Sequence, residues 1–391
     1  MTTYRPKLIV DAHLDLAENV LGSHRDYRRS AYWNRQRESR TLAGRVVGRC
    51  LVGLPELVRG RVGIVFGTIF TMPANNLFTR ALGALTNTAV IYRDAEEAHA
   101  QGMAQLDFYH RWADNEPHVR LIGTQQDLEE VLGDWGMGIG DKRLEIGDWG
   151  LSANLQSPIS NLSVHRIGIV PLMEGADPIL EPKELERWVE RGLRIVAPAW
   201  HATRYSAGTG ESGGLTSLGR ELLAMIAELG VVLDVSHMAE KALYEALDCF
   251  EGRHLIASHS NPQRIMPTDR HLPDPAIERI AERGGVIGVV LFNRFLKKGW
   301  GMGSKKHDVT LDDVVRAVDH ICQVTGSADH VGIGSDFDGG FGAEATPREL
   351  DSSRDLYKVG EELMRRGFGL ENVEKIMYGN WLRILRAALP A

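Results

Sequence analysis

Residues 8–15 have the sequence LIVDAHLD, a short apolar run that ends in polar side chains. Seven further apolar runs follow along the chain, most of them separated by helical patterns. The eight predicted strands span residues 8–15, 62–70, 167–175, 193–201, 231–238, 255–261, 285–292 and 331–339. Apolar strands that alternate with helices indicate a parallel sheet covered on both faces, and eight such units predict a closed (β/α)8 barrel of the α/β class.

The helices between these strands are marked by capping residues. Segment 216–229 begins with Thr216 or Ser217 and stops at Gly230, and segment 311–325 lies between Thr310 and Gly326. A last helix is predicted near 371–389. A six-stranded doubly wound sheet with a second small domain is the alternative architecture, and the count of eight units favours the barrel.

Length and charge limit the classes of protein that fit. We expect the 391 residues to form one barrel domain, with insertions at about 24–60 and 125–160. The net charge of −7 gives no general electrostatic reason to bind nucleic acid or an anionic membrane. There is no apolar leader segment and no apolar run of membrane-spanning length, so we expect a soluble, cytoplasmic protein. Three widely spaced cysteines form no disulfide framework: Cys50, Cys249 and Cys322.

The first insertion has its own charge. Residues 24–40 carry six arginines against Asp26 and Glu38, a local charge of +4, and contain three aromatic residues. Nucleic-acid binding is one interpretation, and a structured insertion is favoured because the surrounding chain is acidic. The segment follows the first strand, so a barrel would place it at the substrate-binding face, where it could act as a lid.

Polar residues close several of the predicted strands, at the end where barrels carry their chemistry. His13 and Asp15 are two residues apart on one strand, so their side chains point the same way. Each polar residue taken alone is more often a core histidine, a helix cap or an ion-pair member. Together, however, such groups at one barrel mouth would be costly unless bound cations neutralised them. The six groups are His13, Asp15, Glu174, His237, His259 and Asp336.

This donor set predicts a centre with two divalent metal ions. Nitrogen and carboxylate ligands favour Zn²⁺, with Mn²⁺, Fe²⁺ or Co²⁺ as alternatives. His13 and Asp15 would hold one ion, His237 and His259 the other, and Glu174 would bridge them. Two ions about 3.5–4 Å apart activate a shared water as the nucleophile. Asp336 holds no ion in this scheme, which leaves it free to move a proton.

Several motifs occur in a specific order along the chain: Asp11-Ala-His13-Leu-Asp15, Met173-Glu174-Gly175, Asp234-Val-Ser-His237, Ser258-His259-Ser260, Gly332-Ile-Gly-Ser-Asp336-Phe-Asp338-Gly339 and Asn380-Trp-Leu-Arg383. In this order they resemble the membrane (renal) dipeptidase family, peptidase family M19, within the binuclear amidohydrolase-like barrels. The resemblance covers the first strand and then nearly all of residues 166–386. It implies a zinc metallopeptidase that cleaves dipeptides, including L-X–D-X dipeptides, and by analogy a homodimer.

The resemblance also implies two substrate contacts. His201 matches a histidine that hydrogen-bonds the tetrahedral intermediate, and Arg270 matches an arginine that holds the C-terminal carboxylate of the substrate. The alternatives are a core histidine under Trp200 and a surface ion pair of Arg270 with Asp269 or Asp274.

One position departs from the family pattern. Tyr205 stands where the family usually has Asn, which leaves the enzyme's preference for substrate side chains near this loop undefined.

Two other functions stay open. A binuclear hydrolase of N-acyl amino acids or lactones is the second function that the residues fit. A catalytically silent binding or scaffold barrel is the third, although none of its expected signs, the loss of a ligand or of Asp336, is present.

Overall fold

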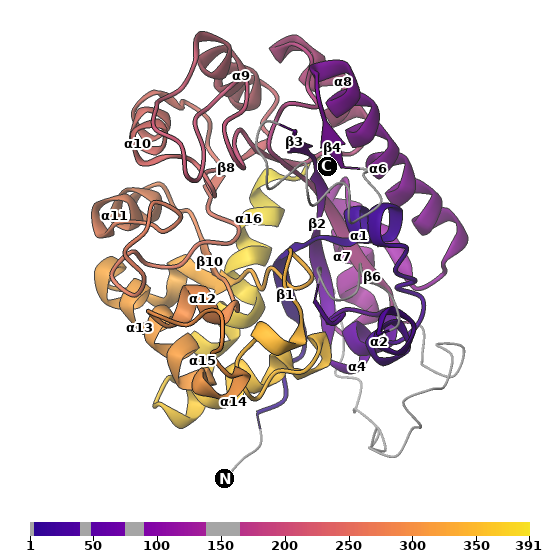
Figure 1. Ribbon diagram of the computed structural model, residues 1–391, viewed down its shortest axis with the longest axis vertical. Coiled ribbons are helices and arrows are strands. Elements are labelled where there is room, and N and C mark those ends of the chain that lie inside the picture. The colour runs from indigo at the N-terminus through magenta and orange to yellow at the C-terminus, as the bar shows by residue number, and fades with distance from the viewer. Residues whose placement is uncertain (1–3, 40–47, 75–89, 138–164) are drawn as a thin grey trace.

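A computed structural model describes residues 4–39, 48–74, 90–137 and 165–391. Eight parallel strands follow one another in the hydrogen-bonded order β10-β11-β1-β2-β6-β7-β8-β9, and a bridge between Ala257 and Ile287 joins the two ends of this row. The strands are β1 (Ile9–Leu14), β2 (Val62–Phe70), β6 (Ile167–Glu174), β7 (Ile195–Ala197), β8 (Val232–Asp234), β9 (Leu255–Ile256), β10 (Ile287–Val289) and β11 (Val331–Ile333). The predicted (β/α)8 barrel is therefore confirmed (Figure 1).

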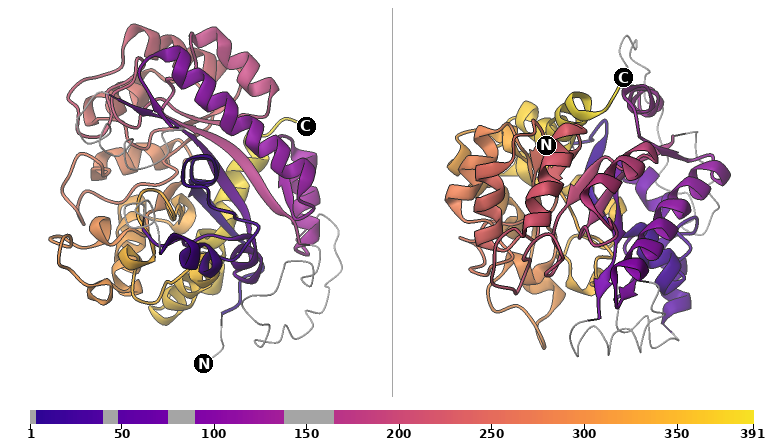
Figure 2. Two further views of the ribbon diagram at one scale, coloured as in Figure 1. Left: turned by 45° about the vertical axis from the view of Figure 1, so that its right-hand side comes forward. Right: turned by 90° about the horizontal axis from the view of Figure 1, so that it is seen from above.

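Helices surround the barrel, as the repeating strand and helix pattern requires (Figures 1 and 2). The long α6 lies along one side, and α9, α10, α11 and α13 lie on the opposite side. The outer helices are α1 (Leu16–Ser23), α6 (Ala95–Asn115), α7 (Gln125–Asp134), α8 (Leu185–Glu190), α9 (Ser217–Glu228), α10 (Glu240–Cys249), α11 (Asp274–Glu282), α13 (Leu311–Thr325), α14 (Tyr357–Arg365) and α16 (Asn380–Ala388). Short elements complete the described chain: α2 (Ala31–Glu38), α4 (Leu54–Arg59), α12 (Asn293–Leu296), α15 (Leu370–Glu374), β3 (Met72–Pro73), β4 (Ile91–Tyr92) and β5 (Val119–Leu121).

The caps predicted for two helices are present. The Thr216 hydroxyl accepts a hydrogen bond from the Gly219 N–H at 3.0 Å at the start of α9. A capping box of Thr310 and Asp313 begins α13, and Gly326, with a φ of 70°, ends it. The last predicted helix has the expected extent but is not uniform, because a π-helical turn at Lys375–Gly379 separates α15 from α16.

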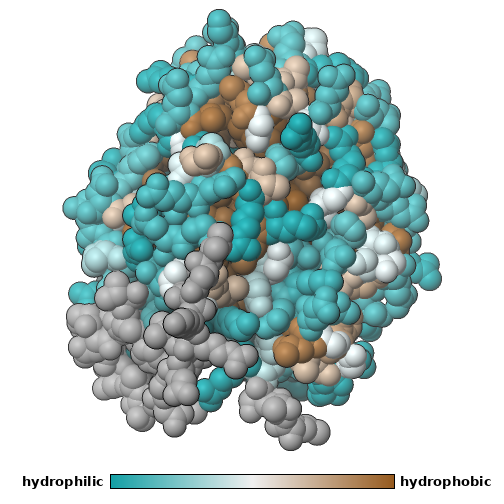
Figure 3. Space-filling view, turned by 180° about the vertical axis from the view of Figure 1, so that it is seen from behind, coloured by the Kyte–Doolittle hydropathy of each residue, from teal (hydrophilic) through white to brown (hydrophobic). Residues whose placement is uncertain are grey.

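Among the described residues, the face of the molecule shown in Figure 3 is mainly hydrophilic, and its hydrophobic side chains form patches. The apolar residues are instead concentrated around the strands, where β2 and β6 are buried along their whole length. None of the helices in the described ranges combines the length and the apolarity that crossing a bilayer would require.

The C-terminal helix fixes the position of the last strand. The Trp381 indole N–H donates to the Ile333 carbonyl at 3.1 Å, and the Asn380 amide donates to the Val331 carbonyl at 2.8 Å. A Cβ at Gly332 would lie 2.2 Å from the Trp381 Nε1, so only glycine fits there. Trp381 therefore fills the space beside this strand.

Five predicted strands end at least three residues earlier than expected: β7, β8, β9, β10 and β11. β7, β8 and β9 stop at Ala197, Asp234 and Ile256, so His201, His237 and His259 lie in the loops that follow and do not close the strands themselves. His237 has a φ of 66°, which takes the backbone out of the extended conformation before this residue. The correction moves these histidines toward the barrel mouth.

The described part of the arginine-rich segment is ordered against the barrel. The buried Arg25 pairs with Asp338 (Nη1 to Oδ1, 3.0 Å) and with Glu38 (Nε to Oε1, 2.7 Å). The Tyr27 hydroxyl donates to Asp338 Oδ2 at 2.9 Å. These contacts attach the segment to the loop after β11, which supports the interpretation as a structured insertion. Residues 40–47, and residues 138–160 of the second predicted insertion, lie outside the described residues.

Asp338→Asn is expected to lower the free energy of unfolding by about 2–4 kcal/mol, because it weakens a buried ion pair and leaves part of the Arg25 charge uncompensated. Asparagine tolerates the left-handed backbone of this position, where φ is 68°, so strain does not account for the loss. Chemical denaturation measures it. Arg28→Ala removes an exposed ion pair with Asp26 and should cost under about 1 kcal/mol. Equal losses would contradict the anchoring role of Asp338.

Candidate metal centre

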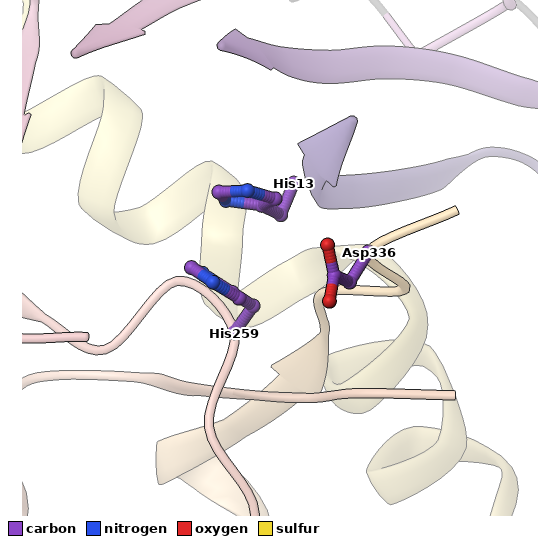
Figure 4. A group of neighbouring side chains, drawn as sticks. All are labelled: His13, His259 and Asp336. Carbon is purple, nitrogen blue, oxygen red and sulfur yellow. The ribbon is translucent and has the colours of Figure 1, made fainter. Parts of the chain in front are cut away.

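The six side chains predicted to form the centre meet at the C-terminal end of the barrel. His13 comes from β1 and Glu174 from the end of β6, Asp15 follows β1, and His237, His259 and Asp336 lie in the loops after β8, β9 and β11. In Figure 4, His13, His259 and Asp336 approach one another from three separate elements. Their donor atoms form three groups within 4.8 Å: His13 with Asp15 and Glu174, Glu174 with His237 and His259, and His13 with His259 and Asp336.

Glu174 lies between the two halves of the cluster. Its Oε2 faces His13 Nε2 at 3.5 Å, and its Oε1 faces the Nε2 atoms of His237 and His259, each at 3.2 Å. The carboxylate is buried. One oxygen toward each set of imidazoles is the geometry of a bridging ligand.

Hydroxyl groups behind the imidazoles fix which nitrogen carries the proton. The Ser258 hydroxyl donates to Asp234 Oδ2 at 2.5 Å, so its oxygen is left to accept from the Nδ1–H of His259 at 2.8 Å. The Thr209 hydroxyl donates to the His237 carbonyl at 3.4 Å and accepts in the same way from His237 Nδ1 at 3.0 Å. Both Nε2 atoms therefore present lone pairs to the centre.

This arrangement fits a bound cation. The two Nε2 lone pairs are 2.9 Å apart, and both point at a carboxylate oxygen, so three acceptors face one another without a donor. The buried His13 Nε2 also has no hydrogen-bond partner among the described residues. Such groups are costly unless a positive charge lies among them. Imidazole nitrogens with carboxylate oxygens are the donors that Zn²⁺ and related divalent ions take.

The electrostatics of the cluster agree with this requirement. Burial, together with the Arg270 charge, lowers the pKa of His237 to about 4, which keeps this imidazole neutral. Burial alone would lower the pKa of His13, but the charges of Glu174, Asp15 and Asp336 raise it to about 10. Burial and the Glu174 charge raise the pKa of Asp15 to about 6. The carboxylates of the cluster thus favour a positive charge among them.

Backbone strain is present at two of the six residues. His237 and Asp336 have φ values of 66° and 60°, in the left-handed region that few residues other than glycine adopt. Asp336 is half-buried among charged groups, and desolvation raises the pKa of its carboxyl well above the usual value. A carboxyl that binds a proton readily, next to two imidazoles, is suited to proton transfer.

Sequence patterns missed the polar residues that hold the centre in place. Thr68 donates to Asp15 Oδ1 at 2.5 Å, and Ser335 donates to Asp11 Oδ2 at 2.5 Å. Asp11 and Asp234 act alike, because each lies shortly before a histidine of the cluster and accepts from a serine on the neighbouring strand's loop. The Asp-x-His and Asp-x-x-His spacings are a signal for these two, whereas nothing in the sequence marks Thr68 or Thr209.

Arg270 is buried beside the cluster, with 6% of its surface exposed. Its Nη2 donates to the His259 carbonyl at 2.6 Å and its Nη1 to the Ser260 hydroxyl at 3.1 Å, while its Nε has no partner among the described residues. The alternative of a surface ion pair is wrong. Asp269 accepts instead from the Gly210 N–H at 2.7 Å, and Asp274 pairs with His320.

His201 lies apart from the six clustered side chains. Its Nδ1 bonds to the Thr209 carbonyl at 2.7 Å and its Nε2 to Glu211 Oε1 at 3.1 Å. The side chain is 21% exposed, so it is not a core histidine. Thr209 links His201 to His237, because its carbonyl contacts His201 and its hydroxyl contacts His237.

Tyr205 is the residue that departs from the family pattern. It is fully buried, and its hydroxyl donates to the Ile179 carbonyl at 2.5 Å, so Tyr205 has a packing role.

Comparisons with known proteins point to one family. A profile of the membrane dipeptidases, peptidase family M19, matches residues 152–390. An uncharacterised protein of the pqqA 5′ region from Klebsiella pneumoniae is 33% identical over 53% of this chain and 76% of its own length. Dipeptidase tcpJ from Claviceps purpurea is 33% identical over 44% of this chain and 38% of its own length, so the match covers less than half of that protein.

Solved structures match almost the whole chain. A metallopeptidase from Rhodobacter sphaeroides, crystallised with a phosphinate mimic of the dipeptide L-Ala-D-Ala, has 22% identity and a TM-score of 0.72, and the match covers 98% of this chain and all of that one. A probable dipeptidase, PvdM, from Pseudomonas aeruginosa has 20% identity and a TM-score of 0.73, with coverage of 98% and 95%. At these identities the match establishes the shared fold.

Proposed function

The chain belongs to the membrane dipeptidase family, peptidase family M19, and on that basis we propose that it hydrolyses the peptide bond of dipeptides with two divalent metal ions at the barrel mouth. The observation that carries the proposal is the pair of imidazole lone pairs facing one oxygen of Glu174, while the other oxygen faces His13. The test is turnover of a dipeptide panel of both stereochemistries by the metal-loaded protein.

The five ligands divide into two sets in this proposal. His13 and Asp15 would hold one ion, His237 and His259 would hold the other, and Glu174 would contact both. Zn²⁺ is favoured because the donors are nitrogens and carboxylates. Bound there, such ions supply an activated water and polarise the scissile carbonyl.

The remaining polar residues act on the substrate. Asp336, next to His13 and His259, takes a proton and passes it to the departing amine. His201 exchanges its Glu211 partner for the oxygen of the tetrahedral intermediate. Arg270 holds the C-terminal carboxylate with its guanidinium, whose Nε–H has no partner among the described residues.

The position of Arg270 limits the length of the substrate. Its guanidinium donates to the backbone carbonyl of the proposed ligand His259, so a carboxylate bound there lies close to the centre. That spacing supports dipeptides as substrates. The L-Ala-D-Ala mimic bound by the related Rhodobacter sphaeroides enzyme supports L-X–D-X dipeptides among them.

Arg270→Ala is expected to lower kcat/KM for a dipeptide by about 100-fold, because a forked, charge-assisted contact to the carboxylate is lost. Hydrolysis of an ester that has no free carboxylate should change far less. Steady-state kinetics on both substrates measure the difference. Arg270→Lys is the control, since it keeps the charge without the fork. Equal losses on the two substrates would contradict the role of Arg270.

Hydrolysis of N-acyl amino acids is the second candidate function. The buried, unpaired Nε of Arg270 favours any substrate with a free carboxylate, and N-acyl amino acids share that group with dipeptides. Lactones lack it and fit less well. Assaying N-acyl amino acids beside the dipeptide panel separates the two functions, since only a dipeptidase prefers the free amino terminus.

We also propose that the chain is one domain. One connected cluster of buried apolar residues extends from Tyr4 to Leu389, which supports a single core. The homodimer stays a prediction.

A further inference from the structure

A small cavity lies beside the metal centre, between the loops that follow β8 and β9. Its lining includes His237, Ser260, Asp269, Arg270 and His271. The cavity is therefore lined both by a proposed metal ligand, His237, and by the proposed carboxylate contact, Arg270. Two of these residues, Asp269 and His271, have no role in the proposed function. Asp269 already accepts a hydrogen bond from the Gly210 N–H.

His271 is buried, with 3% of its surface exposed, and neither of its ring nitrogens has a hydrogen-bond partner among the described residues. Its ring packs edge-on against Phe295, with 4.8 Å between the ring centroids. The Arg270 guanidinium lies 5.7 Å from the centre of the same Phe295 ring. Both side chains therefore pack against Phe295.

A buried polar side chain without partners is unfavourable in the free protein, so such a residue points to a partner that arrives later. Burial and the nearby Arg270 and His237 lower the pKa of His271 to about 3. The imidazole is then neutral, with one N–H to donate and one nitrogen to accept. The Nε–H of Arg270 is unsatisfied in the same region.

We propose that His271 is a second substrate-binding residue, whose imidazole N–H donates to the same C-terminal carboxylate that Arg270 holds. A carboxylate has about four lone-pair positions and can accept from both groups at once. The inference rests on the proposed function only in that the substrate must end in a free carboxylate. An N-acyl amino acid meets that condition as well as a dipeptide does.

The test compares three proteins on two substrates. Wild type, His271→Phe and His271→Asn are assayed with a dipeptide and with the same dipeptide as its C-terminal amide. Phenylalanine fills the space without a donor, and asparagine keeps an N–H. Metal content and thermal unfolding are measured for each protein, so that misfolding or loss of metal is detected separately.

The proposal predicts that His271→Phe raises KM for the free dipeptide about tenfold with kcat little changed, that KM for the amide is unaffected, and that His271→Asn recovers most of the loss. Equal KM changes on both substrates, or none on either, would overturn it. If His271→Phe does not fold, His271→Leu, which is smaller and also lacks a donor, takes its place in the same comparison with His271→Asn and wild type. If wild type cleaves no dipeptide, the proposed function fails, and the comparison is made with an N-acyl amino acid and its amide.

Discussion

Asp336→Asn is expected to lower kcat for a dipeptide by about 10²–10⁴-fold while leaving the metal content unchanged. Asparagine has nearly the same shape and tolerates the left-handed backbone at this position, so the cluster keeps its geometry. What it loses is the ability to take a proton and return it to the leaving amine. Steady-state kinetics together with elemental analysis of the purified variant measure both quantities.

Asp338→Asn is the matched control for that variant. Asp338 lies two residues further along the same loop, has a similar φ of 68°, pairs with Arg25 and belongs to none of the three donor groups of the centre. It should lose stability and keep its turnover at temperatures where it is folded. If Asp336→Asn retains a near-normal kcat, or if both variants lose kcat to the same extent, Asp336 is not the proton-transfer group.

Glu174→Gln is expected to release both ions and to abolish turnover. The amide keeps the volume of the side chain but replaces a bridging oxygen with a donor and removes the negative charge between the imidazoles. His237→Asn should release mainly one ion, because the His13 and Asp15 side of the cluster remains intact. Metal content per chain after dialysis, measured by elemental analysis, separates the two variants.

Glu56→Gln is the control for Glu174→Gln. Glu56 is also a buried carboxylate, but it accepts from the Ala31 backbone N–H and lies outside the donor groups of the centre. It should keep full metal content even if stability falls. Retention of both ions by Glu174→Gln would contradict the bridging role.

The architecture could be predicted because each strand is a continuous apolar run, and burial on both faces requires that composition. The convergence of His13, Glu174 and Asp336 followed from the barrel alone, since parallel strands bring their C-terminal ends to one mouth. The caps of α9 and α13 were predicted from local chemistry. The apolar runs and the caps depend on residues near one another in the chain, and the convergence follows from the barrel that these runs form.

The features that were not predicted depend on contacts between distant residues. Nothing near Asp338 in the sequence indicates that it pairs with Arg25, more than 300 residues away. The hydroxyl of Thr209, which orients His237, lies in a loop without a regular pattern. Strand ends were also placed too late, because the left-handed backbone of His237 has no local marker such as glycine.

The most direct test of the two-ion centre is anomalous X-ray diffraction from crystals grown with Zn²⁺. We expect two anomalous peaks, one on each side of the Glu174 carboxylate, the first within bonding distance of His13 and Asp15 and the second within bonding distance of His237 and His259. A crystal that shows no peak at this cluster, or a single ion that does not touch Glu174, would contradict the account.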